Sequence, residues 1–226
     1  LLAAAVLPGV SGCCGGLSRQ YVRTRPSVLE GGIDMQLAEL IKRRRSIRRY
    51  KKEQISQEEL EAVMTAGAYA PNAGGGQRSI IIAIRSIELS EQLGKINAAC
   101  MDRSRLAGSF VSEEQPSLID DPGIRSGFYG APTVCAIFAP ANFLYSIPDA
   151  FCCAENMVLM ATELGIASCI VARAEETFDN KFGEQLMKKW EIPDNYRARC
   201  FVLLGYHEGD YPKEKPVNKG RIRIIE

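Results

Sequence analysis

The chain has 226 residues, 46% of them hydrophobic and 24% charged, a balance typical of globular proteins that excludes a disordered or fibrous chain. This length suits one domain better than two, since domains commonly have about 150 residues. The formal net charge is +1, so the chain has no overall field that would attract nucleic acid or an anionic membrane, and any basic cluster must act locally.

The eight cysteines and the single histidine indicate neither a metal site nor a hydrolase. No two cysteines have C-x-x-C spacing, and no zinc-type pattern accompanies them, so most are expected to be apolar core residues. His207 follows a predicted strand and is expected to face solvent. A Ser-His-Asp or Cys-His catalytic arrangement is therefore poorly supported.

The first 34 residues differ from the rest. Residues 1–10 are an apolar run followed by Ser11, Gly12 and Cys13, which resembles the end of a bacterial lipoprotein export signal with Cys13 at the lipidated position. The alternative is an apolar arm that packs on the protein. The run is too short to span a bilayer, so membrane attachment is expected only through a lipid at Cys13. This predicts a location at the bacterial cell envelope rather than in the cytoplasm. Residues 1–34 are interpreted as a signal-like and linker segment, and the folded domain is expected over 35–226.

Two helices are predicted at the start of this domain. In residues 35–45 the apolar side chains repeat at helical spacing and the segment ends in cations, which suit the C-terminal end of a helix dipole. Ser56, with Glu59 three residues later, forms a capping box, so a second helix is expected to begin there and to stop before Pro71.

Helices and strands then alternate. Apolar runs of strand length occur at 79–84, 133–139, 167–172 and 200–206, and helices are predicted at 148–164 and 180–190. The first of these strands is expected to be buried on both faces. The pattern predicts an α/β (α+β) domain with layers of helices around a sheet.

The C-terminal segment 221–225 (RIRII) alternates polar and apolar residues at strand period. It has no hairpin mate in the sequence, and such a terminal strand often pairs with the sheet edge of another subunit. We therefore expect it to be exchanged between subunits.

The densest chemical signal is the basic segment 43–50, RRRSIRRY. Guanidinium groups bind phosphate oxygens in pairs and a serine hydroxyl adds another donor, so this segment could hold a phosphate. Binding of nucleic acid and a solvated helix end are the alternatives, and the segment alone does not decide among them.

Four motifs in order narrow the choice. They are RRSIR at 44–48, APNAGGGQ at 70–77, GIASCIVAR at 165–173, and GY at 205–206 followed by KGR at 219–221. Together they resemble the nitroreductase family over roughly residues 35–226. The resemblance implies a three-layer sandwich with a central mixed sheet, FMN as cofactor, NADH or NADPH as electron donor, and a homodimer with FMN at the subunit interface.

From the first and last motifs the resemblance assigns six residues to FMN: Arg44, Arg45, Ser46, Arg48, Lys219 and Arg221. Arg44 and Ser46 correspond to the phosphate ligands, and Arg45 to the ribose and phosphate side. Arg48 corresponds to the contact with the pyrimidine carbonyls, where a cation favours the reduced flavin. Lys219 and Arg221 would complete the phosphate site.

Two further segments are implied to touch the flavin, and both depart from the family pattern. The first comes from the other subunit and comprises Pro71, Asn72, Ala73, Gly75 and Gln77. Here Arg78 and Ser79 replace the family's Pro-Trp pair, which suggests a wider substrate opening. The second approaches the flavin with its backbone amides and comprises Ile170, Val171, Ala172 and Arg173. Ala172 and Arg173 replace a small glycine, and the side chains of this segment could equally be strand core.

The implied activity is a ping-pong oxidation and reduction at one site. A nicotinamide would reduce FMN, and a small electron-poor acceptor, of the nitroaromatic or quinone type, would then be reduced. The flavin supplies the redox chemistry, so no protein acid or base is predicted. The alternatives are a flavin protein of the same fold with another acceptor, such as a dehalogenase or dehydrogenase, a non-enzymatic FMN carrier, and a nucleic-acid-binding module.

Overall fold

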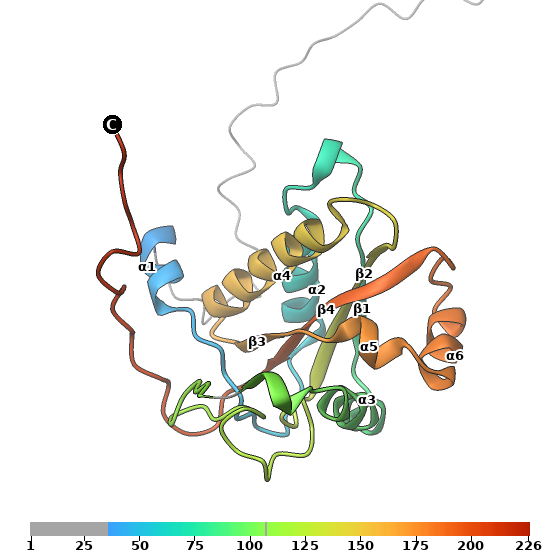
Figure 1. Ribbon diagram of the computed structural model, residues 1–226, viewed down its shortest axis with the longest axis horizontal. Coiled ribbons are helices and arrows are strands. Elements are labelled where there is room, and N and C mark those ends of the chain that lie inside the picture. Colours follow the sequence, from blue (N-terminus) through green and yellow to red (C-terminus); the bar gives the residue numbers. More distant parts are fainter. Residues whose placement is uncertain (1–35, 107) are drawn as a thin grey trace, which may run out of the picture. The chain divides into compact units, whose positions relative to one another are not determined.

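The computed structural model describes residues 36–106 and 108–226. The predicted signal segment 1–34, with Cys13, and the first residue of the predicted domain at 35 lie outside the described residues, so the predictions for them stay predictions. The elements, in order, are α1 (Leu37–Arg43), α2 (Gln57–Ala68), η2 (Ala73–Gly75), β1 (Ile80–Ile84), α3 (Ile87–Ala99), η3 (Arg103–Leu106), β2 (Thr133–Pro140), α4 (Ser146–Glu163), β3 (Ala167–Val171), α5 (Ala174–Phe178), α6 (Lys181–Lys189) and β4 (Tyr196–Gly205) (Figure 1).

The four strands form one sheet in the order β1-β2-β4-β3, with every neighbouring pair antiparallel. A mixed sheet was expected. Parallel pairing is confined, in the described part of the chain, to a bridge between Ser46 and Ser168. The reason lies in the connections: β2 and β3 point the same way and are joined by α4, but β4 is inserted between them and runs the other way. The alternation of helices and strands in the sequence does not reveal such an insertion.

The sheet carries a core on each face, which gives the three layers. On one face Cys135, Ile137 and Val202 pack with α2 and α4. On the other, Phe138 and Phe201 pack with the aromatic residues of α5 and α6 and with α3. Alternate residues of β2 and β4 thus face opposite layers, and because both faces are covered, the sequence of β2 is almost wholly apolar.

The helix starts follow from capping residues. At α2, Ser56 Oγ accepts from the backbone N–H of Glu59 at 3.1 Å, and Glu59 Oε2 accepts from the N–H of Ser56 at 2.8 Å. The predicted capping box is confirmed. The helix α3 was not predicted, although Ser86 caps it by accepting from the N–H of Leu89 at 3.2 Å. Ser86 is therefore the residue in the sequence that could have indicated the start of α3.

Three further differences from the predictions concern β1, β4 and the C-terminal segment. β1 is half-buried over most of its length rather than buried on both faces, because it lies at the edge of the sheet. β4 begins at Tyr196, four residues earlier than predicted, where it pairs with the end of β2. Residues 221–225 are exposed and form no strand within the single chain. Their exchange between subunits stays a prediction.

Candidate functional site

The basic segment after α1 is extended and is fixed against the ends of β3 and β4. The N–H of Ile47 donates to Ser168 O at 2.9 Å, and the N–H of Lys51 donates to Tyr206 O at 2.8 Å. Ile47 is buried, and so is Tyr50, whose hydroxyl donates to Ile47 O at 2.6 Å. Burial raises the pKa of Tyr50 well above its usual range. These two side chains anchor the segment in the core, so its arginines are placed at a fixed position on the sheet edge.

Beside this segment lies a cavity of about 630 Å³, which we call the basic cavity. Its lining residues are Arg44, Arg45, Ser46, Arg48, Val111, Ser112, Glu114, Gln115, Pro212, Lys215, Pro216, Val217, Asn218 and Arg221. Five of these described side chains are cationic and one is a carboxylate. A cavity with this excess of positive charge is suited to an anion such as a phosphate ester.

Arg45 carries the most specific feature of the basic cavity. Its Nε donates to Lys213 O at 2.9 Å and its Nη1 to Arg44 O at 2.6 Å. Its Nη2 is buried and has no hydrogen-bond partner. A buried donor without a partner costs about 1–3 kcal/mol, so the site lacks an acceptor at this position. A phosphate oxygen would satisfy it, and the residues present therefore fit the FMN phosphate.

Arg48 connects the basic cavity to a second, smaller one. Its backbone N–H donates to Gln115 Oε1 at 2.6 Å, its Nη1 donates to Gln115 O at 2.9 Å, and its guanidinium carbon lies 5.7 Å from the ring centroid of Tyr129. Burial raises the pKa of the Cys169 thiol. The Arg48 cation and a hydrogen bond with Ser46 act in the opposite direction, but burial outweighs them. This thiol is therefore a poor nucleophile.

The smaller cavity, of about 130 Å³, shares Arg48 and Val111 with the basic cavity. We call it the turn cavity because the end of β3 and the following turn line it. Its lining residues are Arg48, Met101, Val111, Ser117, Leu118, Ile119, Tyr129, Cys169, Ile170, Val171, Ala172 and Arg173. The two cavities together offer a cationic region and, next to it, residues 170–173.

Most of the predicted residues therefore come together although they are far apart in sequence. Nine line the two cavities: Arg44, Arg45, Ser46, Arg48, Ile170, Val171, Ala172, Arg173 and Arg221. Lys219 lines neither cavity and is exposed between two residues that do line the basic one.

The other predicted loop lies elsewhere within the chain. Pro71, Asn72, Ala73, Gly75 and Gln77 line neither cavity. Instead, the N–H of Ala73 donates to Asp149 Oδ1 at 3.0 Å, which ties the loop to the first turn of α4, and the N–H of Gln77 donates to Asn72 Oδ1 at 2.8 Å. A role for this loop at the site requires a second copy of the chain, as the resemblance implies.

Two lining segments escaped sequence reasoning: residues 111–119 and the tail 212–218. Neither has helical or strand periodicity, and their places follow from contacts distant in sequence. Gln115 is 5% exposed because it bonds Arg48, and the tail is held by the bond of Arg45 to Lys213 O. Nothing in the sequence of these segments indicated either contact.

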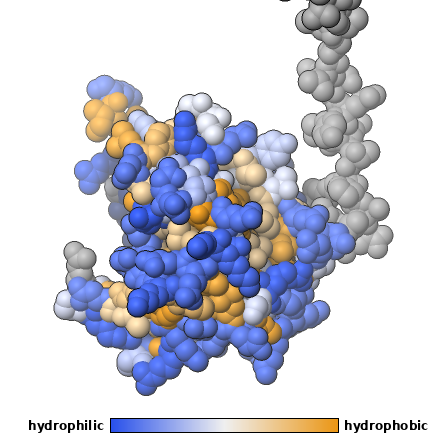
Figure 2. Space-filling model, turned by 90° about the vertical axis from the view of Figure 1, so that its right-hand side faces the viewer, coloured by the Kyte–Doolittle hydropathy of each residue, from blue (hydrophilic) through white to orange (hydrophobic). Residues whose placement is uncertain are grey.

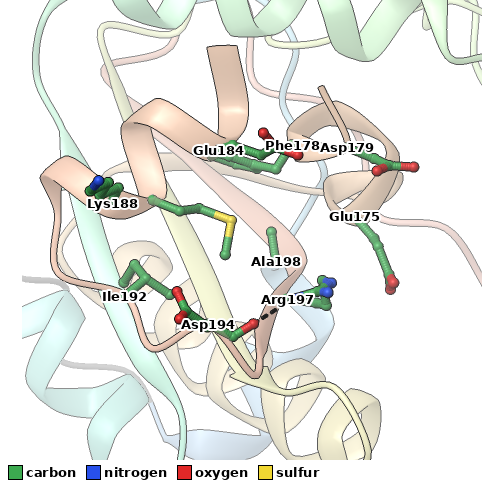
Figure 3. A pocket seen from close by; sticks show the side chains of 10 residues that line it. Glu175, Phe178, Asp179, Glu184, Lys188, Ile192, Asp194, Arg197 and Ala198 are labelled. Carbon is green, nitrogen blue, oxygen red and sulfur yellow. Dashed lines mark hydrogen bonds between the residues drawn. The ribbon is translucent and has the colours of Figure 1, made fainter. Parts of the chain in front are cut away.

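A further cavity lies apart from these residues, on the side of the molecule where α5 and α6 lie, and has a volume of about 550 Å³. Figure 2 shows this side, where hydrophilic side chains surround a patch of apolar ones. Figure 3 shows carboxylates such as Glu175 and Glu184 around the cavity, together with Arg197, whose Nη1 donates to Asp194 O at 2.9 Å. No predicted site residue lines it, and its mixed charges indicate no particular ligand.

Over residues 36–106 and 108–226, no helix is both long and apolar enough to cross a bilayer. The same residues contain no group of three His, Cys, Asp or Glu side chains placed to hold a metal ion.

A model of the nitroreductase family matches residues 41–206, from the basic segment to the end of β4. The chain belongs to the nitroreductase family. Among curated proteins, this nitroreductase-family chain is 26% identical over 191 residues to a protein of Archaeoglobus fulgidus provisionally named NADH dehydrogenase/NAD(P)H nitroreductase, covering 81% of the chain and 94% of that protein.

Solved nitroreductases have the same fold. The nitroreductase from Bacteroides fragilis with bound FMN is 30% identical, with a TM-score of 0.69, over 85% of this chain and 100% of that one. The nitroreductase from Desulfitobacterium hafniense with bound FMN is 26% identical, with a TM-score of 0.68 and the same coverage of both chains. An iodotyrosine deiodinase bound to FMN and 3-iodo-L-tyrosine is 20% identical with a TM-score of 0.64 and shares the fold. The three-layer nitroreductase fold predicted from the sequence is confirmed.

Proposed function

We propose that this chain is an FMN-dependent oxidoreductase that binds FMN across the basic and turn cavities, accepts electrons from NADH or NADPH, and reduces a small electron-poor acceptor. Membership of the nitroreductase family and the FMN bound by two similar nitroreductases support the cofactor. The name of the Archaeoglobus relative supports a nicotinamide donor. The single observation that carries the proposal is the buried Nη2 of Arg45, which lacks an acceptor, on a residue that lines a cavity with five cationic side chains.

The residues of this chain would bind and orient the cofactor. Arg44, Arg45 and Ser46 would hold its phosphate, with Arg221 from the tail on the same cavity. Arg48, which lines both cavities, would place a positive charge at the pyrimidine edge of the ring. When bound, FMN supplies the transfer of electrons from the nicotinamide to the acceptor. No side chain is required as an acid or base for this transfer.

A homodimer would bring the loop 71–77 of a second copy to this site. An apolar groove of about 790 Å³ on α1, α2 and α4 offers a surface for the contact, and its rim includes Leu37, which is 64% exposed, and Tyr69, which is 84% exposed. Burial of such side chains would stabilise the dimer. The exposed tail 221–225 would add to the contact if it is exchanged.

The proposed acceptors are nitroaromatics and quinones, reduced at the site that the nicotinamide has left, so that donor and acceptor bind in turn. Replacement of the family's Pro-Trp pair by Arg78 and Ser79 supports a wider opening. Arg78 turns back on its own loop: its Nη1 donates to Ala73 O at 3.0 Å and its guanidinium carbon lies 4.6 Å from the ring centroid of Phe143. A side chain held in this way leaves the opening less filled.

The test is to purify residues 35–226, record the visible spectrum, and add NADH or NADPH without oxygen. We expect a yellow protein whose flavin band near 450 nm, roughly where flavins absorb, is bleached by at least one nicotinamide. Return of the band on addition of a nitroaromatic or a quinone, compared with a halogenated substrate, then identifies the acceptor class. A protein that binds FMN but is bleached by neither nicotinamide would instead be a carrier, and a protein that fails to take up FMN would refute the proposal.

For residues 1–34 we propose export with a lipid at Cys13, on the sequence pattern alone. The measurement is mass spectrometry of the full chain from a bacterial host. A diacylglycerol-modified Cys13 at the mature N-terminus supports the proposal, and an unmodified Cys13 contradicts it.

A further inference from the structure

The turn after β3 contains a residue in a conformation that side chains disfavour. Arg173 has φ 61° and ψ 30°, in the left-handed region where any residue with a Cβ is strained. In the resemblance to the nitroreductase family, Ala172 and Arg173 stand where the pattern has a small glycine. Such a conformation persists only where the surroundings fix it. Ala172 and Arg173 of this turn also line the turn cavity, and the resemblance to the nitroreductase family implies that their backbone approaches the flavin.

A buried asparagine from α3 fixes this turn. Asn97 is 0% exposed, and its Nδ2 donates to Ala172 O at 2.9 Å and to Thr177 Oγ1 at 2.9 Å. Thr177 Oγ1 in turn donates to Arg173 O at 2.6 Å. Since the peptide group is planar and trans, fixing Ala172 O also fixes the direction of the Arg173 N–H, which points to the opposite side. The hydrogen bonds of Asn97 therefore set the direction of one backbone donor in the turn.

The side chain of Arg173 completes the arrangement. Its Nη2 donates to Asn97 Oδ1 at 2.9 Å and its Nε donates to Asn97 O at 3.2 Å. Asn97 lies in the last turn of α3, where carbonyls lack partners within the helix and cations are favoured. Gly127 leaves the space for this asparagine, because a Cβ there would overlap Asn97 Oδ1. We call Asn97, Ala172, Arg173 and Thr177 the Asn97 clamp.

We propose that Asn97 is a positioning residue: through the Asn97 clamp it holds the Arg173 N–H toward the flavin ring in the turn cavity, and so sets how much more tightly the protein binds reduced than oxidised FMN. The inference rests on the proposed FMN site. A donor aimed at a carbonyl oxygen of the ring stabilises the reduced form, which carries more negative charge there, more than the oxidised form. Arg173 thus serves the site by bonding Asn97, rather than by reaching a substrate with its side chain.

The test measures the dissociation constants of oxidised and reduced FMN for the intact protein, by flavin fluorescence and by anaerobic titration. In Asn97→Ala and in Arg173→Gly we expect the preference for reduced FMN to fall about tenfold, the effect of losing one hydrogen bond to a charged group. For a two-electron couple this is a midpoint potential about 30 mV more negative. Glycine tolerates the left-handed turn, so Arg173→Gly removes the two bonds that hold Asn97 in the clamp without adding backbone strain.

Two controls separate positioning from other effects. Ser86→Ala weakens α3 at its opposite end, by removing the cap on Leu89, and we expect it to keep the wild-type preference. Arg173→Lys keeps the positive charge but not the two-armed bond to Asn97, and we expect it to behave like Arg173→Gly. A wild-type preference in Arg173→Lys would mean that charge alone matters, and that result would overturn the inference even if Asn97→Ala did not fold.

Failure of this inference and failure of the proposed function are distinguishable. If the wild-type protein binds neither form of FMN, the proposed site is wrong and the inference fails with it. If the wild-type protein binds FMN and all variants keep its preference for the reduced form, the inference alone is refuted.

Discussion

Replacing Arg45 with alanine tests the phosphate site directly, because this side chain has the clearest unmet hydrogen-bonding capacity. Its Nη2 is buried without a partner, while its other two nitrogens bond the carbonyls of Lys213 and Arg44. A charge-assisted hydrogen bond to a phosphate oxygen stabilises by about 1.5–3 kcal/mol. Arg45→Ala should therefore weaken FMN binding by about 10- to 150-fold, since about 1.4 kcal/mol is a factor of ten in the dissociation constant.

The assay is a fluorescence titration of apoprotein with FMN and, in parallel, with riboflavin, which lacks the phosphate. We expect the loss for FMN and little change for riboflavin. The matched control is Arg197→Ala. Like Arg45, Arg197 donates to two backbone carbonyls, since its Nη1 bonds Asp194 O at 2.9 Å and Tyr196 O at 2.7 Å, but Arg197 lines the separate cavity beside α6. Equal losses for both ligands, or an equal loss in the control, would refute the reasoning that places the phosphate at Arg45.

Three further predictions concern the fold. Ser56→Ala removes the cap of α2 and should lower the free energy of unfolding by about 1 kcal/mol in urea denaturation. Glu59 should keep the hydrogen bond that it accepts from the Tyr206 hydroxyl at 2.7 Å. An unchanged urea midpoint would contradict the stabilising role of the cap. Gly165→Ala should cost about 1–2 kcal/mol by thermal unfolding, because Gly165 has φ 72° and nothing lies within 4 Å of an added Cβ, so only backbone strain acts; no loss would show that the turn relaxes. Burial raises the pKa of Cys135 and of Cys200 from 9.0 to about 12. As pH rises, the thiols therefore lose their protons in the unfolded chain before they do so in the folded protein. The free energy of unfolding should fall between about pH 9 and pH 12, by at most about 1.4 kcal/mol per pH unit for each thiol. Denaturation curves of a Cys135→Ala, Cys200→Ala double variant should lack this part of the slope.

The residues of the candidate site differ in how far the sequence alone could predict them. The segment 44–48 combines guanidinium groups with a hydroxyl, and these side chains indicate that it could bind a phosphate but do not by themselves exclude nucleic acid or a solvated helix end. The resemblance to the nitroreductase family then brought in Arg221 and residues 170–173, which the structure places on the same two cavities. By contrast, Gln115 was not predicted, because its place follows from a bond to Arg48 across 67 positions of the chain.

The sequence by itself determined the local features: the capping box at Ser56, the apolar strands, the basic segment and the order of the four motifs, since each depends on residues a few positions apart. The tertiary structure decided the rest. It inserted β4 between β2 and β3, which makes the sheet antiparallel, and it placed Asn97 of α3 against Arg173, 76 positions later. Such contacts depend on which elements pack together, and neither periodicity nor local hydrogen bonding carries that information.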